Sequence, residues 1–232
     1  MRKLGLLSLL ILLSFSAFAQ KQKIIALSNY DYKKFHFGMA LNFGFYNLVN
    51  DYSSDFLNND DVLSIETDGD IGLGVSFILP DLRLNDRLNF RHILTVKTIQ
   101  RNIKYRFSPD FDGPSEVTQN VESWFVESGL HLKYRADRIN NHRAFIFVGP
   151  NIAIDMASEK DVIDENIFKL NRSNFALEIG AGCDFYFEYF KFAPQIKYSY
   201  GLKNLIVEDG TIFTSPLDGF YSRGIQISFT FE

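Results

Sequence analysis

The sequence contains segments in which large apolar residues alternate with small or polar residues. In the stretch FHFGMALNFGFY, residues 35–46, every odd position is apolar, and the even positions hold His, Gly, Ala, Asn and Tyr. Alternation with a period of two predicts a β-strand whose two faces differ. Six side chains make up the apolar face of this strand: Phe35, Phe37, Met39, Leu41, Phe43 and Phe45.

Seven further segments show the same alternation, so the chain is predicted to form eight strands. They are residues 71–77, 88–107, 124–134, 144–156, 175–187, 192–200 and 225–231. In the segment 88–107 the apolar residues move from even to odd positions after Val96, which predicts a β-bulge or a strand end that leaves the apolar zone. The alternations run on the order of ten residues, about the length of a strand that spans a bilayer.

The predicted connections alternate between short and long along the chain. Short turns cover residues 80–87, 135–141 and 188–190, and long polar loops cover residues 47–70, 108–120, 157–174 and 203–220. Outer-membrane β-barrels have short periplasmic turns and longer external loops. An even number of strands then leaves both ends of the chain on the periplasmic side.

The second face of the strands decides between a soluble barrel and a membrane barrel. A soluble barrel exposes charged and polar residues, whereas a membrane barrel turns its apolar face to lipid and its polar face to the lumen. Here the second face is rich in Gly, Ala and Asn, which suits the crowded interior of an eight-stranded barrel. We therefore predict an all-β fold, an eight-stranded antiparallel up-and-down transmembrane β-barrel. A soluble periplasmic barrel is the alternative.

Charged residues of both signs fall on the face that is predicted to line the lumen. They are Arg91, Lys97, Glu127, His131, Lys133, Arg143, Asp155, Glu178, Asp184 and Lys197. Because an unpaired charge in a closed interior is costly, we interpret them as a structural network of ion pairs that fills the barrel. A substrate path or a proton relay is the alternative.

The N-terminus predicts export from the cytoplasm. Residues 1–20 read MRKLGLLSLLILLSFSAFAQ, with two basic residues, an apolar stretch and a small-x-small site. This is the pattern of a cleaved signal peptide at residues 1–19, with cleavage between Ala19 and Gln20. We expect residues 20–34 to form a periplasmic tail, and residues 35–232 to form the barrel in the outer membrane.

Composition and motifs exclude several functions. The 232 residues carry a net charge of −4, so the basic face of a nucleic-acid-binding protein is not expected. The single cysteine, Cys183, and four scattered histidines give no metal-ligand spacing and no catalytic motif. His131 with Glu127 is the best candidate pair on one strand face, and we interpret it as structural. We expect no enzyme, metal, cofactor or small-molecule substrate.

Three segments resemble the PorT/SprT family of the type IX secretion and gliding system of Bacteroidetes. They are NYDYKKFHFG at residues 29–38, VESWFVESGLHLKYRADRINNHRAFIFVGPNIAIDMAS at 121–158 and IGAGCDFYFEYFKFAPQIKYSYGLKN at 179–204, together with the ending ISFTFE. The resemblance implies an outer-membrane protein required for export of cargo that carries a C-terminal secretion domain. It further implies an accessory role with other secretion components as partners, and it implies no catalytic residue.

Two other functions stay open at this point. The first is a passive, OmpX-like structural or adhesive barrel that acts through its external loops, and the second is a lipid-modifying enzyme. The tail at residues 20–34 has two interpretations as well. It is either a disordered tether before the first strand or a segment that docks to a periplasmic component.

Overall fold

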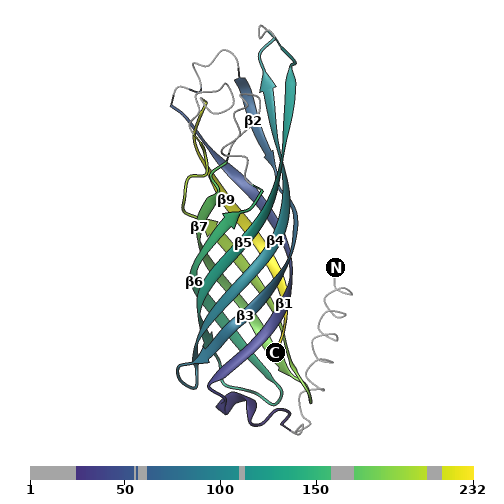
Figure 1. Ribbon diagram of the computed structural model, residues 1–232, viewed down its shortest axis with the longest axis vertical. Coiled ribbons are helices and arrows are strands. Elements are labelled where there is room, and N and C mark those ends of the chain that lie inside the picture. The colour runs from purple at the N-terminus through teal and green to yellow at the C-terminus, as the bar shows by residue number, and fades with distance from the viewer. Residues whose placement is uncertain (1–24, 55, 57–61, 110–112, 158–169, 208–215) are drawn as a thin grey trace, which may run out of the picture.

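The computed structural model describes residues 25–54, 56, 62–109, 113–157, 170–207 and 216–232. The predicted signal peptide and its cleavage position between Ala19 and Gln20 lie outside the described residues. In the described part the chain forms one antiparallel sheet that closes into a barrel (Figure 1). No helix in these ranges is long and apolar enough to cross a membrane.

A short 3-10 helix, η2 (Tyr30–Tyr32), precedes nine strands. The strands are β1 (Phe35–Tyr52), β2 (Val62–Asp68), β3 (Asp70–Arg83), β4 (Leu88–Phe107), β5 (Glu116–Arg135), β6 (His142–Asp155), β7 (Ser173–Tyr186), β8 (Lys191–Gly201) and β9 (Leu217–Phe231). They follow the order β2-β4-β3-β1-β9-β8-β7-β6-β5, and the pairing of β4 with β5 closes the ring.

β2 and β3 occupy one position in this ring. β3 pairs with the lower part of β4 and β2 pairs with its upper part, and only Gly69 separates the two strands. A Cβ atom on Gly69 would lie 2.9 Å from the backbone oxygen of Tyr46, so a side chain does not fit there. The predicted eight-stranded barrel is confirmed, with one of its eight positions shared by β3 and the short strand β2. Residues 62–68, predicted as loop, form strand β2.

The apolar face of the wall points outward. The six apolar side chains of β1, from Phe35 to Phe45, are between 41% and 61% exposed. Large apolar residues of the other strands continue this belt, for example Leu73 on β3, Val148 on β6 and Ile227 on β9. A soluble barrel would bury these residues, so the wall has the polarity of a membrane barrel.

β4 explains the change of apolar phase that the sequence shows after Val96. β4 and β5 keep one register from end to end, without a shift at this point, so the predicted bulge is wrong. Beyond Val96 the outward positions become polar, as at Gln100, while Ile99, Ile103 and Tyr105 are buried inside. The end of this strand thus leaves the apolar zone, which was the alternative prediction to a bulge.

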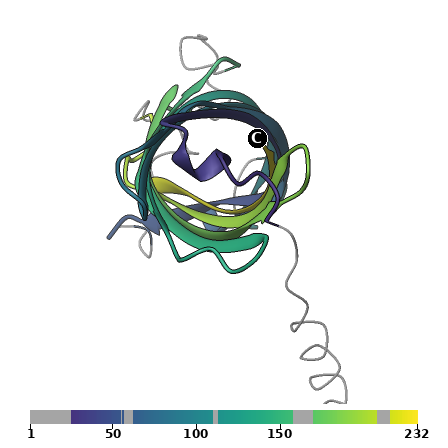
Figure 2. The ribbon, with the colours of Figure 1, turned by 90° about the horizontal axis from the view of Figure 1, so that it is seen from below.

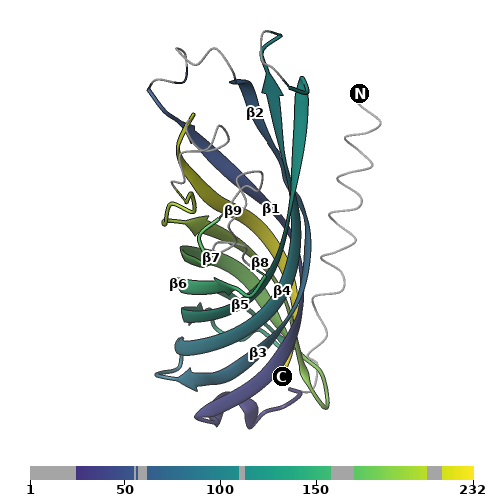
Figure 3. The ribbon, with the colours of Figure 1, turned by 45° about the horizontal axis from the view of Figure 1, so that its top comes forward.

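The interior beyond this point is a small apolar core. The strands β1, β2, β4 and β5 project past the rest of the wall on this side (Figures 1 and 3). Buried apolar residues fill the space between their upper parts and the neighbouring loops: Leu48, Val62, Ile65, Ile103, Tyr105, Phe107, Leu170, Leu205, Ile206, Leu217 and Phe220. We call this side of the molecule the long-loop end.

The opposite side is the short-turn end. The connections β3–β4, β5–β6 and β7–β8 lie here and cover residues 84–87, 136–141 and 187–190. The alternation of short and long connections along the chain is thereby confirmed. The C-terminus and helix η2 also lie at this end (Figure 1).

Candidate functional site

The structure places all ten charged residues that were predicted for the lumen on the inner face of the wall. None of them exposes more than 8% of its surface. Eight of the ten contact another polar side chain of the lumen. Asp155 accepts from the backbone nitrogen of Trp124, and Arg143 reaches the short-turn end. The lumen is therefore filled by paired polar side chains.

His131 and Glu127, the predicted pair, do not contact each other as partners. The two residues lie on β5 four positions apart, so they share a face but are about 13 Å apart along the strand. His131 Nε2 instead lies 2.7 Å from Glu178 Oε2 on β7, and Glu178 Oε1 accepts from Lys197 Nζ at 2.8 Å. Glu127 pairs with Lys97 at 2.7 Å. His131 thus takes part in a hydrogen-bonded network of the interior with Glu178 and, through it, with Lys197.

A second network closes the lumen toward the short-turn end. Lys133 Nζ donates to both carboxylate oxygens of Asp184 at 3.1 Å. Arg91 pairs with Asp81 at 2.9 Å and with Glu232 at 3.2 Å. Sequence reasoning missed Asp81 and Glu232, because each lies at or beside a strand end, where the alternation no longer identifies the face.

Helix η2 lies inside the ring of strands at the short-turn end. Figure 2 shows it within the opening of the barrel, seen from below. Tyr30 Oη donates to Glu232 Oε2 at 2.5 Å, and the Tyr30 ring stacks on His36 with centroids 4.1 Å apart. Burial, together with the charge of Glu232, raises the pKa of Tyr30 far above its ordinary value, so its hydroxyl stays protonated and donates.

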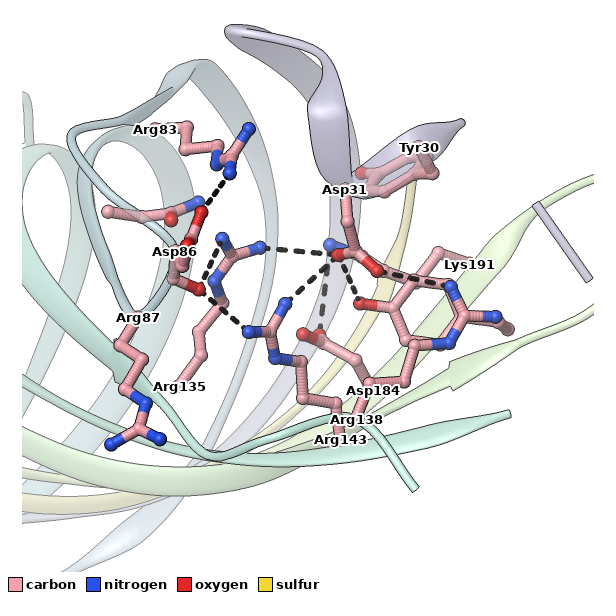
Figure 4. A network of polar contacts seen from close by, with 12 residues as sticks. Tyr30, Asp31, Arg83, Asp86, Arg87, Arg135, Arg138, Arg143, Asp184 and Lys191 are labelled. Carbon is pink, nitrogen blue, oxygen red and sulfur yellow. Dashed lines mark hydrogen bonds and ion pairs between the residues drawn. The ribbon is translucent and has the colours of Figure 1, made fainter. Parts of the chain in front are cut away.

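Asp31 contacts three arginines in the same place (Figure 4). Its Oδ2 accepts from Arg138 Nη1 at 3.1 Å and its Oδ1 accepts from Arg143 Nη1 at 3.0 Å, while Arg135 Nη1 lies 3.6 Å away. Tyr186 Oη donates to Oδ1 at 3.1 Å. Burial alone would raise the pKa of Asp31, but the hydrogen bond from Arg138 and the charge of Arg143 outweigh it and lower the pKa below its usual range.

Backbone contacts also attach the tail to the wall. Ala26 N donates to Asn141 Oδ1 at 3.0 Å, Arg138 donates to the carbonyl oxygen of Ala26, and Arg83 N donates to Lys34 O at 2.9 Å. The interpretation of the tail as a disordered tether is therefore wrong for residues 25–34. We call these residues the plug. No local pattern in the sequence predicts the plug, because its contacts come from residues far apart in the chain.

The charged residues at the short-turn end pair with one another and with the plug, and they close the opening of the barrel. The carboxylates of Asp31, Asp81, Glu127, Glu178, Asp184 and Glu232 each accept from a basic side chain, and Asp155 accepts from the backbone nitrogens of Trp124 and Ala157. In the parts of the chain that the structure describes, no three His, Cys, Asp or Glu residues gather as metal ligands would. What this end of the barrel presents is a plugged opening that is lined by arginines.

Three solved structures are similar in overall arrangement. The Neisserial surface protein NspA is 10% identical with a TM-score of 0.43, and the match covers 85% of this chain and 98% of that one. OprG of Pseudomonas aeruginosa is 14% identical with a TM-score of 0.43, over 84% and 92%. The attachment invasion locus protein Ail of Yersinia pestis, in complex with the heparin analogue sucrose octasulfate, is 12% identical with a TM-score of 0.37, over 86% and 99%.

A family match completes the comparison. No curated protein matches the sequence significantly. Residues 18–207 match the family described as outer membrane protein beta-barrel domain. This range runs from the end of the predicted signal peptide to the last loop before β9. The chain therefore belongs to the outer membrane protein β-barrel domain family, and it is a protein of the outer membrane.

Proposed function

We propose that this barrel is an accessory component of the type IX secretion machinery, and of the gliding machinery where that exists. In this role it supports the assembly of the translocon or the export of cargo that carries a C-terminal secretion domain. The basis of the proposal is the resemblance to the PorT/SprT family, since membership of the β-barrel domain family covers many functions.

The observation that carries the proposal is where the resembling segments lie in the structure. Residues 29–38 supply the plug residues Tyr30 and Asp31, and residues 121–158 supply the three arginines around Asp31. Residues 179–204 supply Asp184 and Tyr186, and the ending ISFTFE supplies Glu232. These segments, far apart in sequence, meet at the short-turn end, which faces the periplasm in outer-membrane barrels. We infer that this end contacts the machinery.

The filled lumen supports an accessory role over a conducting one. Eight strands leave an interior that is only wide enough for side chains. Here ion pairs occupy it, and the plug covers its periplasmic opening. A protein substrate has no room in such a barrel, so transport of cargo belongs to another component.

Deletion of the gene tests the proposal. We expect type IX cargo to stay inside the cell, and we expect full-length protein supplied from a plasmid to restore export. A version whose β4–β5 loop, residues 108–115, is replaced by a two-residue turn serves as the matched control. It should restore export as well, because the loop lies at the long-loop end. Normal export in the deletion strain would overturn the secretion role.

A passive structural or adhesive barrel is the second candidate. The observation in its favour is the long-loop end, where projecting strands around an apolar core form an ordered external platform. If this role is the right one, the deletion strain exports cargo normally, and the version with the shortened β4–β5 loop loses adhesion. We also propose that the protein is not an enzyme, so the lipid composition of the deletion strain should equal that of the wild type.

A further inference from the structure

Three arginines at the periplasmic opening share a single carboxylate. Arg135 ends β5, Arg138 lies in the following turn, and Arg143 lies at the start of β6; we call them the arginine cluster. In the described ranges, Asp31 is the one carboxylate that forms ion pairs with them. The cluster therefore carries two positive charges more than Asp31 balances.

The barrel itself holds the cluster in place. Arg143 Nε donates to the carbonyl oxygen of Ala136 at 2.6 Å, and its Nη2 donates to that of Asp86 at 2.7 Å. Arg138 Nε donates to the carbonyl oxygen of Asn140 at 2.9 Å. None of these acceptors belongs to the plug. The guanidinium groups of both residues thus keep their orientation when Asp31 is absent, as a preformed anion site requires.

Arg135 shows that Asp31 does not satisfy the cluster. Its side chain is buried, and its Nε has no hydrogen-bond partner. Its Nη1 lies 3.6 Å from Asp31 Oδ1, which is too long for a hydrogen bond. A buried donor without an acceptor is costly. Its Nη2 reaches the carbonyl oxygen of Asp86 at 3.4 Å, so Nε is the donor that is left unmet, and a second carboxylate beside Arg135 would supply its acceptor.

The plug is attached mainly through polar contacts that a ligand is able to replace. No residue of η2 is fully buried, and no side chain caps the N-terminus of this helix. The attachment therefore depends on the contacts of Tyr30, Asp31 and a few backbone atoms, and the packing of the Tyr30 ring against His36 and Tyr186 is its main apolar part. A ligand that brings its own carboxylates exchanges charge-assisted hydrogen bonds for similar ones, so the exchange costs little.

We propose that the arginine cluster is a binding site for an acidic peptide segment of a periplasmic protein, and that this segment takes the place of Asp31. Two or more adjacent carboxylates fit the charge of the cluster and the unmet donor of Arg135. In the free barrel Asp31 acts as an internal competitor for the same site. The inference goes beyond the secretion role and is tested without it, on the purified protein.

The first measurement is the binding of a fluorescently labelled hexaglutamate peptide to the full-length barrel in uncharged detergent, followed by anisotropy. Asp31→Asn should tighten the binding by about threefold or more, because a competing ligand lowers the apparent affinity of a site. Arg138→Gln combined with Arg143→Gln should weaken it by about tenfold or more, since two charge-assisted hydrogen-bond donors are lost. Labelled hexaglutamine should not bind.

Arg87→Gln is the matched control, because Arg87 lies at the same end and pairs with Asp137 on the surface, outside the cluster. It should bind hexaglutamate as the wild type does. A shift in gel mobility on heating shows for each variant whether the barrel is folded. Equal binding by the variant that lacks two cluster arginines, no tightening by Asp31→Asn, or no binding by either the wild type or Asp31→Asn would each overturn the proposal.

Discussion

Asp31 holds the plug through the same groups that set the pKa of its carboxyl. Because Arg138 and Arg143 lower this pKa, the docked plug binds fewer protons in the acid range than the released plug does. The contribution of Asp31 to docking is thus present in full above the ordinary pKa of aspartate, about 3.9. It is lost as the pH falls through the lowered pKa.

The lowered pKa of Asp31 predicts how plug docking depends on pH. Hydrogen–deuterium exchange of residues 25–34, corrected for the intrinsic rate at each pH, should stay slow between about pH 8 and pH 5. It should speed up progressively as the pH falls below about 4, where Asp31 of the released plug binds a proton, and through the lowered pKa of the docked residue. Asp31→Asn is the control and should exchange fast over the whole range. A plug that is released already near pH 6 would contradict the role given to Asp31.

Gly149 on β6 is a residue whose side-chain position is occupied by backbone. A Cβ atom there would lie 1.9 Å from the carbonyl oxygen of Leu130, whereas a Cβ on Gly129 would come no closer than 3.3 Å, to a side-chain atom of His131. Gly149→Ala should therefore destabilise the barrel by about 1–3 kcal/mol, the usual cost of overpacking, or prevent folding. Gly129→Ala should cost clearly less. Urea unfolding in lipid vesicles measures both, and equal values would refute the packing argument.

At this scale the sequence predicts the face of a residue but not its partner. The period of two placed His131, Glu127 and Lys97 on the inner face correctly. The partners depend on which strands face each other across the lumen, and Glu178 comes from β7, two strands away in the ring. No local spacing contains that information.

At the scale of the strand, the switch of apolar phase within β4 marks where the wall leaves the apolar belt. Apart from His92, the outward residues are apolar up to Val96, and they are polar from Thr98 onward. The inner face changes in the opposite sense, from Arg91 and Lys97 to Ile103 and Tyr105. β4 thus passes from a membrane environment into water without a shift in its register with β5. Its two faces exchange polarity at this point.

A lysine placed on either side of this boundary tests it. Leu41→Lys, within the apolar belt of β1, should cost about 2–4 kcal/mol of stability in vesicles, since it puts a charge near the midplane of the bilayer. Gln100→Lys, on the outer face of β4 beyond the belt, should cost nothing measurable, and it brings the lysine beside Glu122. If both variants lose the same stability, the assigned boundary is wrong.

The elements that escaped sequence reasoning lie beyond this boundary. Residues 62–68 and the first part of β5, residues 116–120, were predicted as loop because their outward side chains are polar. The inward apolar positions there are too few to show a clear alternation. Within the belt, the residues that face lipid are apolar along the whole strand. The alternation at residues 35–46 and 175–187 therefore predicts strands clearly, and the structure has β1 and β7 there.

At the scale of the whole molecule the interior has three zones in series. The plug covers the periplasmic opening, a network of ion pairs fills the middle, and an apolar core fills the long-loop end. Each zone consists of different residue types, and side chains occupy the interior in each of them. With all three zones filled, the barrel is a closed structure and not a conduit.

Electrical recording in a planar lipid bilayer tests this claim most directly. Purified full-length barrel, and a form that lacks residues 25–34, should both insert without giving steady ion conductance. The truncated form opens only one zone, and the ion pair of Lys133 with Asp184 and the hydrogen bond of His131 with Glu178 still fill the next. An insertion-dependent, steady conductance in the full-length protein would contradict the account.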